Sequence, residues 1–226
     1  MSLVGTSVES RARQSKGASD DAIYAMVGSL LRLRPRGGLL FDIGCGRGLL
    51  HSYVSELVDR YVGADVVRYE GFPQETEFHQ IDLDSGRVPL ADDAADIVVA
   101  VETIEHLENP RAFVRELTRL CRPGGMLIVT TPNQLSFLSK LTLVLKNRFN
   151  AFSDSNYPAH ITALLEVDLR RILAECGWQK VRVEFSRHGR IPGTRRHWPT
   201  FLSRLLPRAF SDNVMVVGVK PEQLVV

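Results

Sequence analysis

The segment "LLFDIGCGRGLL", residues 39–50, decides the fold class. An apolar run ends at Asp42, and Gly44, Gly46 and Gly48 then alternate with other residues before a helix-like pattern begins. A short apolar run bounded by glycines is typical of a buried strand, and glycine lets the backbone approach a ligand without a Cβ in the way. The segment therefore predicts a strand, a ligand-binding turn and a helix, in that order.

Strand and helix patterns alternate through the first half of the chain. We expect helices over 20–34, 48–60, 109–121 and 166–176, and strands over 39–44, 61–66, 77–83, 95–102, 126–131, 180–185 and 213–220. This alternation predicts an α/β fold with a parallel sheet and right-handed crossovers. The last two strands are joined by a longer connection and are candidates for an antiparallel pair at the sheet edge.

Length and composition indicate a globular chain. Its 226 residues suggest one domain, and a net charge of +2 does not by itself indicate a nucleic-acid binder. Three scattered cysteines, Cys45, Cys121 and Cys176, favour a reduced, cytoplasmic protein. The polar start has no apolar core of signal-peptide length, and no window reaches the roughly 18 apolar residues of a membrane span. We expect a loose N-terminal tail over 1–19 and a single domain over 20–226.

Acidic residues lie near the carboxyl ends of three of the predicted strands. Asp42 stands two residues before the first glycine, where it would repel a pyrophosphate but suits a ligand with an ammonium group. Asp65 ends the second strand, where a carboxylate can accept both hydroxyls of a ribose. Asp82 follows the third strand and can accept a hydrogen bond from an adenine amino group. These three acids describe S-adenosylmethionine (SAM), which has an amino-acid end, a ribose and an adenine, and no phosphate.

A nicotinamide-dependent oxidoreductase is the disfavoured rival. The glycines read G-x-G-x-G and not the G-x-G-x-x-G of dinucleotide-binding turns. Asp42 and the lack of a Tyr-x-x-x-Lys pair also argue against it.

Five motifs in order resemble the class I SAM-dependent methyltransferases, in the branch often called type 11. They are "FDIGCGRG", "GADV", "IDLDSGRVPL", "ADIVVAVETIEHLENP" and "LCRPGGMLIVTTPN", and the close resemblance covers residues 39–131. It implies a Rossmann-like, seven-stranded, mostly parallel sheet with helices on both faces and the last strand antiparallel. It also implies SAM as cofactor, with S-adenosylhomocysteine as the product.

The resemblance implies a cofactor site on these motifs. SAM would lie at Asp42, Gly44, Gly46, Asp65 and Asp82, with Cys45, Gly48, Val66 and Leu83 beside them. Val101 and Glu102, at the end of the fourth strand, would border the cofactor and the substrate. We expect Cys45 to fill space in the turn, in preference to a redox role.

The run "VETIEH", residues 101–106, bears on the acceptor. DNA and protein amino-methyltransferases often carry Asn/Asp-Pro-Pro-aromatic there, so this run disfavours that class. If the turn is helical, Glu102, Glu105 and His106 share a face and could hold a divalent metal, with His160 as a fourth ligand. Similar runs in ubiquinone-pathway O-methyltransferases and small-RNA 2′-O-methyltransferases are linked to a metal. The favoured alternative to a metal is that His106 or His160 acts as a base or contacts the substrate. A further alternative is that Glu102 touches the cofactor while Glu105 and His106 cap or brace the following helix.

Two insertions should choose the acceptor. Near 133–161 and 188–211, apolar helical stripes alternate with lysines and arginines, on the side expected for the active site. They either cover the sheet as a lid, form an apolar acceptor cleft, or rest on an anionic membrane surface. We therefore expect O-methylation of a small or lipid-linked acceptor, with peripheral contact at the inner membrane surface as one version. An RNA 2′-O-methyltransferase-like enzyme and a non-catalytic SAM-fold binding subunit remain the alternatives, and the oligomeric state stays open.

Overall fold

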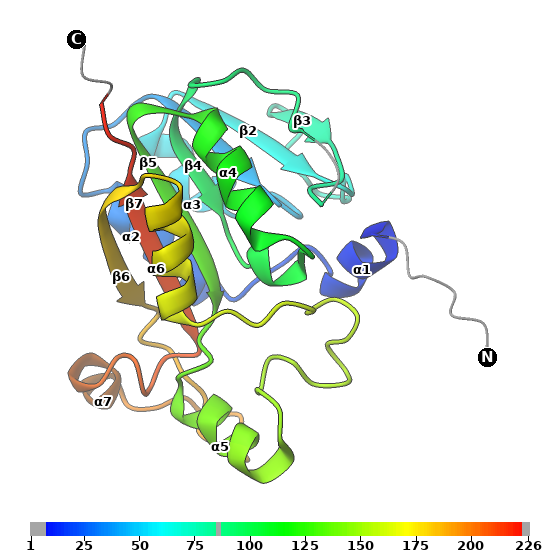
Figure 1. Ribbon diagram of the computed structural model, residues 1–226, viewed down its shortest axis with the longest axis vertical. Coiled ribbons are helices and arrows are strands. Elements are labelled where there is room, and N and C mark those ends of the chain that lie inside the picture. The colour runs from blue at the N-terminus through cyan, green and yellow to red at the C-terminus, as the bar shows by residue number, and fades with distance from the viewer. Residues whose placement is uncertain (1–7, 85–86, 223–226) are drawn as a thin grey trace.

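A computed structural model describes residues 8–84 and 87–222 of the chain. Its centre is one seven-stranded sheet with the order β3-β2-β1-β4-β5-β7-β6 (Figure 1). The strands are β1 (Leu39–Ile43), β2 (Arg60–Asp65), β3 (Glu77–Gln80), β4 (Ala95–Ala100), β5 (Cys121–Pro132), β6 (Gln179–Phe185) and β7 (Asn213–Val219).

The direction of the strands agrees with the predicted fold class. Strands β1 to β5 pair parallel, whereas β7 pairs antiparallel with both β5 and β6. The Rossmann-like sheet with an antiparallel last strand, expected from the sequence, is therefore confirmed. The order of β1 and β4 at the centre creates a switch point, and ligands bind beyond the carboxyl ends of strands at such a point.

Helices cover both faces of the sheet and form two cores. On one face lie α4 (Pro110–Leu120) and α6 (Glu166–Glu175), and on the other lie α2 (Asp21–Leu31) and α3 (His51–Val54) (Figure 1). Neighbouring residues of β4 alternate between the two cores, Val98 facing α4 and Val99 facing α2. Near-continuous apolar strands are explained by this burial on both faces.

Three sequence expectations differ from the structure. The helix expected over 48–60 is only α3 and one 3₁₀ turn (Ser55–Leu57), because Gly48 has φ +72° and helical backbone begins after it. The strand expected over 126–131 is longer in the structure: β5 also includes residues 122–125, "RPGG", where its pairing with β4 is irregular. The tail expected to be loose contains α1 (Val8–Ser15), which packs on the protein, while residues 1–7 lie outside the described residues.

The two predicted insertions carry the remaining helices. The first contains α5 (Phe137–Lys146) and a long loop to α6, and the second contains α7 (Thr200–Leu205). Both helices lie at the same end of the molecule, beyond the sheet (Figure 1). In the described part of the chain, we find no helix with the length and apolar character needed to cross a membrane.

Candidate active site

A cavity of about 1100 Å³ lies beyond the carboxyl ends of β1, β2, β4 and β5. Its walls come from the glycine turn after β1, the loop after β4, α5, and α1 with the segment that follows it. Ligand pockets commonly measure about 300–1,000 Å³, so this space can hold two ligands together. One end lies at the glycine turn and the other reaches α5.

The glycine turn after β1 is shaped by two close approaches. Gly44 has φ +80°, and a Cβ there would come within 2.3 Å of the Thr103 side chain. Gly46 has φ +52°, and a Cβ there would lie 2.4 Å from the carbonyl oxygen of Gly17. Only glycine adopts these conformations without strain. The turn lines the cavity, and glycine is needed at both positions because Thr103 and Gly17 lie directly against it.

Asp42 provides a buried acceptor at this end of the cavity. Its Oδ2 accepts a hydrogen bond from the Tyr61 hydroxyl, and its Oδ1 has no hydrogen-bond partner among the described residues. Burial raises the pKa of Asp42 to about 7. Buried polar atoms are normally satisfied, so an orphaned carboxyl oxygen that lines a cavity points to a ligand with a donor, such as an ammonium group.

Asp65 occupies the position predicted for ribose recognition. It lies at the end of β2 and lines the cavity, and its carboxylate accepts hydrogen bonds from Gly46 N at 2.8 Å and Val67 N at 3.2 Å. Burial raises the pKa of Asp65. The backbone amides hold the carboxylate in a fixed orientation, and each oxygen keeps lone-pair capacity for a ligand hydroxyl.

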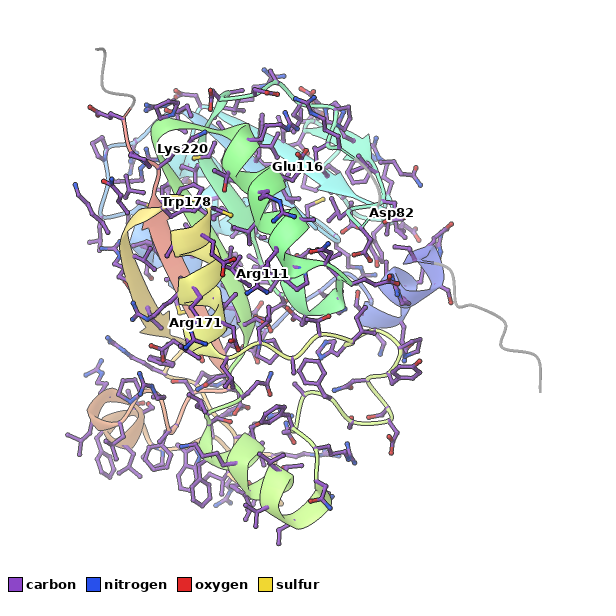
Figure 2. The ribbon with its side chains drawn as sticks, viewed as in Figure 1. Asp82, Arg111, Glu116, Arg171, Trp178 and Lys220 are labelled. Carbon is purple, nitrogen blue, oxygen red and sulfur yellow. The ribbon has the colours of Figure 1, made fainter. Side chains whose placement is uncertain are left out.

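Most of the predicted cofactor residues meet in this cavity. Those that line it are Asp42, Gly44, Cys45, Gly46, Asp65, Val66, Leu83, Val101 and Glu102. Gly48 and Asp82 do not line it: Gly48 packs beneath Phe72 and Pro73, and Asp82 lies in the loop after β3, on the α1 side of the sheet (Figure 2). Asp82 Oδ1 accepts from Asp84 N at 2.9 Å, so that carboxylate shapes the loop that places Leu83. Cys45 is packed in the core, and burial raises the pKa of its thiol.

The segment around α1 closes over the cofactor end. Arg11 pairs with Asp84 at 3.0 Å and Glu108 at 3.0 Å, and Tyr69 donates its hydroxyl to the carbonyl of Ala12 at 2.6 Å. After the helix, Gly17 O accepts from Arg47 N at 2.8 Å, which joins this segment to the glycine turn. The sequence does not predict these contacts, because α1 has no buried residue and therefore shows no apolar periodicity.

Glu102 lies where β4 ends and departs from the predicted helical face. Its backbone has φ +49°, and its carboxylate accepts from Thr130 Oγ1 at 2.9 Å and Asn213 Nδ2 at 2.8 Å. The turn that follows is a short 3₁₀ helix, Ile104–His106, so the i, i+3, i+4 spacing does not bring the three side chains onto one face. The shared helical face on which the metal alternative depended is therefore not formed, and Glu102 lies outside the cluster of possible ligands.

Glu105, His106 and His160 form a different cluster, whose possible ligand atoms all lie within 4.8 Å of one another. Glu105 is fully buried; Oε2 accepts from Thr131 Oγ1 at 3.0 Å, and Oε1 has no partner among the described residues. Burial raises the pKa of Glu105 to about 8. The two imidazole rings meet edge to face with centroids 4.8 Å apart.

Hydrogen bonds to carbonyls set the tautomer of both imidazoles. Nδ1 of His106 lies 2.8 Å from the carbonyl of Ala159, and Nδ1 of His160 lies 2.8 Å from that of Ala151. A carbonyl only accepts, so each Nδ1 donates and each Nε2 keeps its lone pair. Burial lowers the pKa of both rings, to about 4 in His160, which keeps them neutral at pH 7. The cluster can therefore accept a proton from an acceptor hydroxyl or bind a divalent cation.

Three polar residues that support the site were not singled out in the sequence. Thr130 and Thr131 hold Glu102 and Glu105, and Asn213 of β7 holds Glu102 from the other side. The two threonines end the otherwise apolar run "MLIVTT", and hydroxyls at the carboxyl end of a buried strand are the signal that would have found them. Asn213 comes from a distant segment, and its place beside β5 follows only from the sheet order.

Comparisons with known proteins agree with this geometry. A family model described as a methyltransferase domain matches residues 20–183. The chain is 31% identical over 117 residues to a probable S-adenosylmethionine-dependent methyltransferase of Mycolicibacterium smegmatis, covering 50% of this chain and 46% of that protein. It is 32% identical over 126 residues to a ubiquinone biosynthesis O-methyltransferase of Xanthomonas axonopodis pv. citri, covering 50% and 51%. The chain thus spans about half the length of the curated relatives it matches.

A solved structure shares the fold over nearly the whole chain. It is a SAM-dependent methyltransferase from Archaeoglobus fulgidus, with a TM-score of 0.67 and 16% sequence identity, and the match covers 92% of this chain and 97% of that one. At this level of identity the likeness shows the fold alone.

Proposed function

Because the chain belongs to the methyltransferase-domain family, we propose that it binds SAM and transfers the methyl group to a hydroxyl of a small or lipid-linked acceptor. The proposed setting is the cytoplasm, at the inner membrane surface when the acceptor is lipid-linked. The cofactor would lie along Asp42, Gly44, Gly46 and Asp65.

One observation carries this proposal: a single cavity joins the acids of the glycine turn to the lone pairs of His106 and His160. Asp42 Oδ1 is an unpartnered acceptor suited to the ammonium of SAM, and Asp65 is suited to its ribose hydroxyls. An acceptor that reaches the histidines through the same space would meet the cofactor without crossing bulk water. The geometry thus suits direct transfer between two ligands.

The reaction requires two things of the chain: it must align the acceptor hydroxyl with the methyl group, and it must accept the hydroxyl proton. SAM, when bound, supplies an electrophilic methyl group on a sulfonium. In the transfer the S–CH₃ bond breaks with its electron pair going to sulfur, and an O–CH₃ bond forms. The hydroxyl proton goes to Nε2 of His106 or His160, which is unprotonated because its Nδ1 donates to a backbone carbonyl. General-base assistance of this kind is worth about 10²–10⁴-fold in rate.

The acceptor side of the cavity supports an acceptor with apolar parts. Leu138, Leu141 and Leu145 of α5 line it, together with Thr142 and Asn156. A hydroxyl at His160 with apolar groups along α5 fits this lining. The name of the Xanthomonas relative, a ubiquinone biosynthesis O-methyltransferase, supports oxygen as the acceptor atom.

A divalent cation at Glu105, His106 and His160 is a second candidate, favoured by their convergence. The residues fit such an ion, because two neutral imidazoles and an orphaned carboxyl oxygen are suitable ligands. There the cluster would position the acceptor oxygen through the ion and favour its deprotonated form. A site with a bound cation would also suit an enzyme of the RNA 2′-O-methyltransferase type.

Two readouts test the proposal. Calorimetry with S-adenosylhomocysteine measures cofactor binding, and release of S-adenosylhomocysteine from SAM in the presence of candidate acceptors measures turnover. We expect binding and acceptor-dependent turnover. Binding without turnover across aqueous, lipid and RNA acceptors would instead support a non-catalytic binding subunit, and absence of binding would overturn the cofactor assignment.

A further inference from the structure

Helices α5 and α7 each bury a serine and expose large apolar side chains. Ser139 is the only buried residue of α5 and Ser203 the only buried residue of α7. In contrast, Val144 is 78% exposed, Leu145 70%, Phe201 67% and Leu205 73%. A helix in a globular protein normally turns its apolar stripe toward the core. These two helices therefore have exposed apolar side chains that no other part of the described structure covers. Of the 11 exposed large hydrophobic side chains in the described residues, seven lie on or beside these helices: Phe137, Leu143, Val144, Leu145, Phe201, Leu205 and Leu206.

The exposed apolar side chains lie on two segments that contact each other. We call these segments, residues 134–150 and 187–211, the α5–α7 surface. Phe137 N, at the start of α5, donates to the carbonyl of Ala209 at 2.7 Å, just after α7. Phe137 also meets Trp198 edge to face at 5.8 Å, and Trp198 packs on Phe210 at 4.7 Å. This aromatic cluster ties the two insertions together at the end of the molecule beyond the sheet (Figure 1).

Charge is divided unevenly between this surface and the rest of the chain. Residues 134–150 and 187–211 contain nine lysines and arginines and no aspartate or glutamate. The remaining chain has 19 basic and 26 acidic side chains, a formal charge of −7. Within the described residues, we find no hydrogen bond or ion pair for the side chains of Lys140, Lys146, Arg148, Arg195, Arg196 and Arg204.

We propose that the α5–α7 surface docks on an anionic lipid bilayer. Exposed aliphatic side chains surrounded by unpaired cations match a bilayer surface, where apolar groups enter the acyl boundary and cations meet lipid phosphates. A second copy of the chain is a poor occupant, because the six unpaired cations of one copy would face the same six cations of the other. A nucleic acid is a poor occupant as well, because valine and leucine side chains offer no face on which a base can stack.

Docking in this position deepens the proposed function, on which its biological meaning rests. Leu145 and Lys146 belong to the α5–α7 surface and also line the cavity. The edge of the acceptor end therefore lies on the face that would meet the bilayer. A lipid-linked acceptor could enter along α5 toward His160 without leaving the membrane surface.

Vesicle flotation at about 0.15 M salt tests the docking. We expect the full chain to float with phosphatidylcholine vesicles that contain about 30% phosphatidylglycerol, and not with phosphatidylcholine alone. The charge-reversed variant Arg195→Glu/Arg196→Glu/Arg204→Glu and the apolar variant Val144→Ser/Phe201→Ser/Leu205→Ser should each lose about tenfold or more of the binding. Matched controls at exposed positions away from the surface, Arg32→Glu/Arg36→Glu/Arg115→Glu and Leu33→Ser, should bind like the wild type.

Affinity for S-adenosylhomocysteine, measured on the same preparations, separates the two proposals. The surface variants should keep the wild-type affinity within about twofold, which also shows that they fold. Failure of the wild type to float while it binds S-adenosylhomocysteine would overturn the docking and leave the proposed function standing. Equal loss in the control variants, or self-association of the wild type that the apolar variant abolishes, would also overturn it.

Discussion

At the scale of single residues, the site retains carboxyl groups that are costly to bury. Asp42 and Glu105 each keep one oxygen without a hydrogen bond in the described part of the chain. An unsatisfied buried polar atom costs about 1–3 kcal/mol, so such atoms are expected where a ligand supplies the missing partner. Both residues line the same cavity.

The first prediction concerns Asp42. Burial raises its pKa to about 7, so it binds a proton in the free protein as pH falls through that value. A ligand ammonium favours the ionised form, so affinity for S-adenosylhomocysteine should fall about tenfold between pH 8 and pH 6. Calorimetry at both pH values measures this. The variant Asp42→Asn should bind at least about tenfold more weakly and lose the pH dependence, whereas pH-independent affinity of the wild type would contradict the assignment.

A second prediction separates catalysis from cofactor binding. His106→Ala and His160→Ala should lower turnover by about 10²–10⁴-fold and keep affinity for S-adenosylhomocysteine within about threefold. Burial lowers the pKa of His160 to about 4, so this ring stays neutral between pH 8 and pH 6, and turnover at saturating SAM should not fall because His160 gains a proton. His79→Ala, a surface histidine paired with Glu77, is the matched control. Unchanged turnover in both site variants would refute a base role.

A third prediction tests the cation version of the site. Burial raises the pKa of Glu105 to about 8, so an ion must displace a proton from it at neutral pH. Affinity for Co²⁺, followed by its absorption spectrum, should therefore rise as pH increases from 6 to 8, by up to about tenfold per unit. Glu105→Gln should remove the spectrum, and Glu102→Gln should leave it because Glu102 lies outside the cluster. A spectrum that survives in Glu105→Gln would place the ion elsewhere.

At the scale of elements, sequence patterns predicted the parts of the fold that bury apolar side chains. The strand β1, the helix α4 with Asn109 capping Ala112 N, and the β6–β7 pair all follow from such patterns. The failures have a common cause. Both α1 and the 3₁₀ turn around Glu105 are held by polar contacts to distant loops, and no local periodicity reports those contacts.

Helix α1 and residues 16–20 line the cofactor end of the cavity, and we call this segment the strap. Arg11 links α1 to Asp84, with both side chains only 11% exposed, and Asp84 adjoins the cavity residue Leu83. Arg11→Ala should loosen the strap and speed release of S-adenosylhomocysteine by about threefold to tenfold, since one partly buried ion pair is worth about 1 kcal/mol. Stopped-flow displacement measures the rate. Arg13→Ala is the control, because Arg13 pairs only within α1 to Glu9; equal acceleration in both variants would rule out a specific strap.

At the scale of the whole molecule, the cavity connects three regions that lie far apart in the chain. The glycine turn, the loop carrying His160 and the helix α5 line one continuous space. From the sequence we could predict that 133–161 and 188–211 lie on the active-site side, since both follow strands whose ends face it. The joining of the two insertions through Phe137 and Trp198 could not be predicted, because it depends on a tertiary contact between separate segments.

The fate of the methyl group shows whether the chain transfers it to an acceptor oxygen. We would incubate the chain with methyl-labelled SAM and an extract of the organism that encodes it, with and without a chelator, and then separate organic, aqueous, nucleic-acid and protein fractions. We expect one labelled methyl ether in the organic or aqueous small-molecule fraction for each S-adenosylhomocysteine released, and loss of both products in His106→Ala and His160→Ala. Label on a nitrogen or carbon atom, or binding of SAM with no labelled product in any fraction, would contradict it.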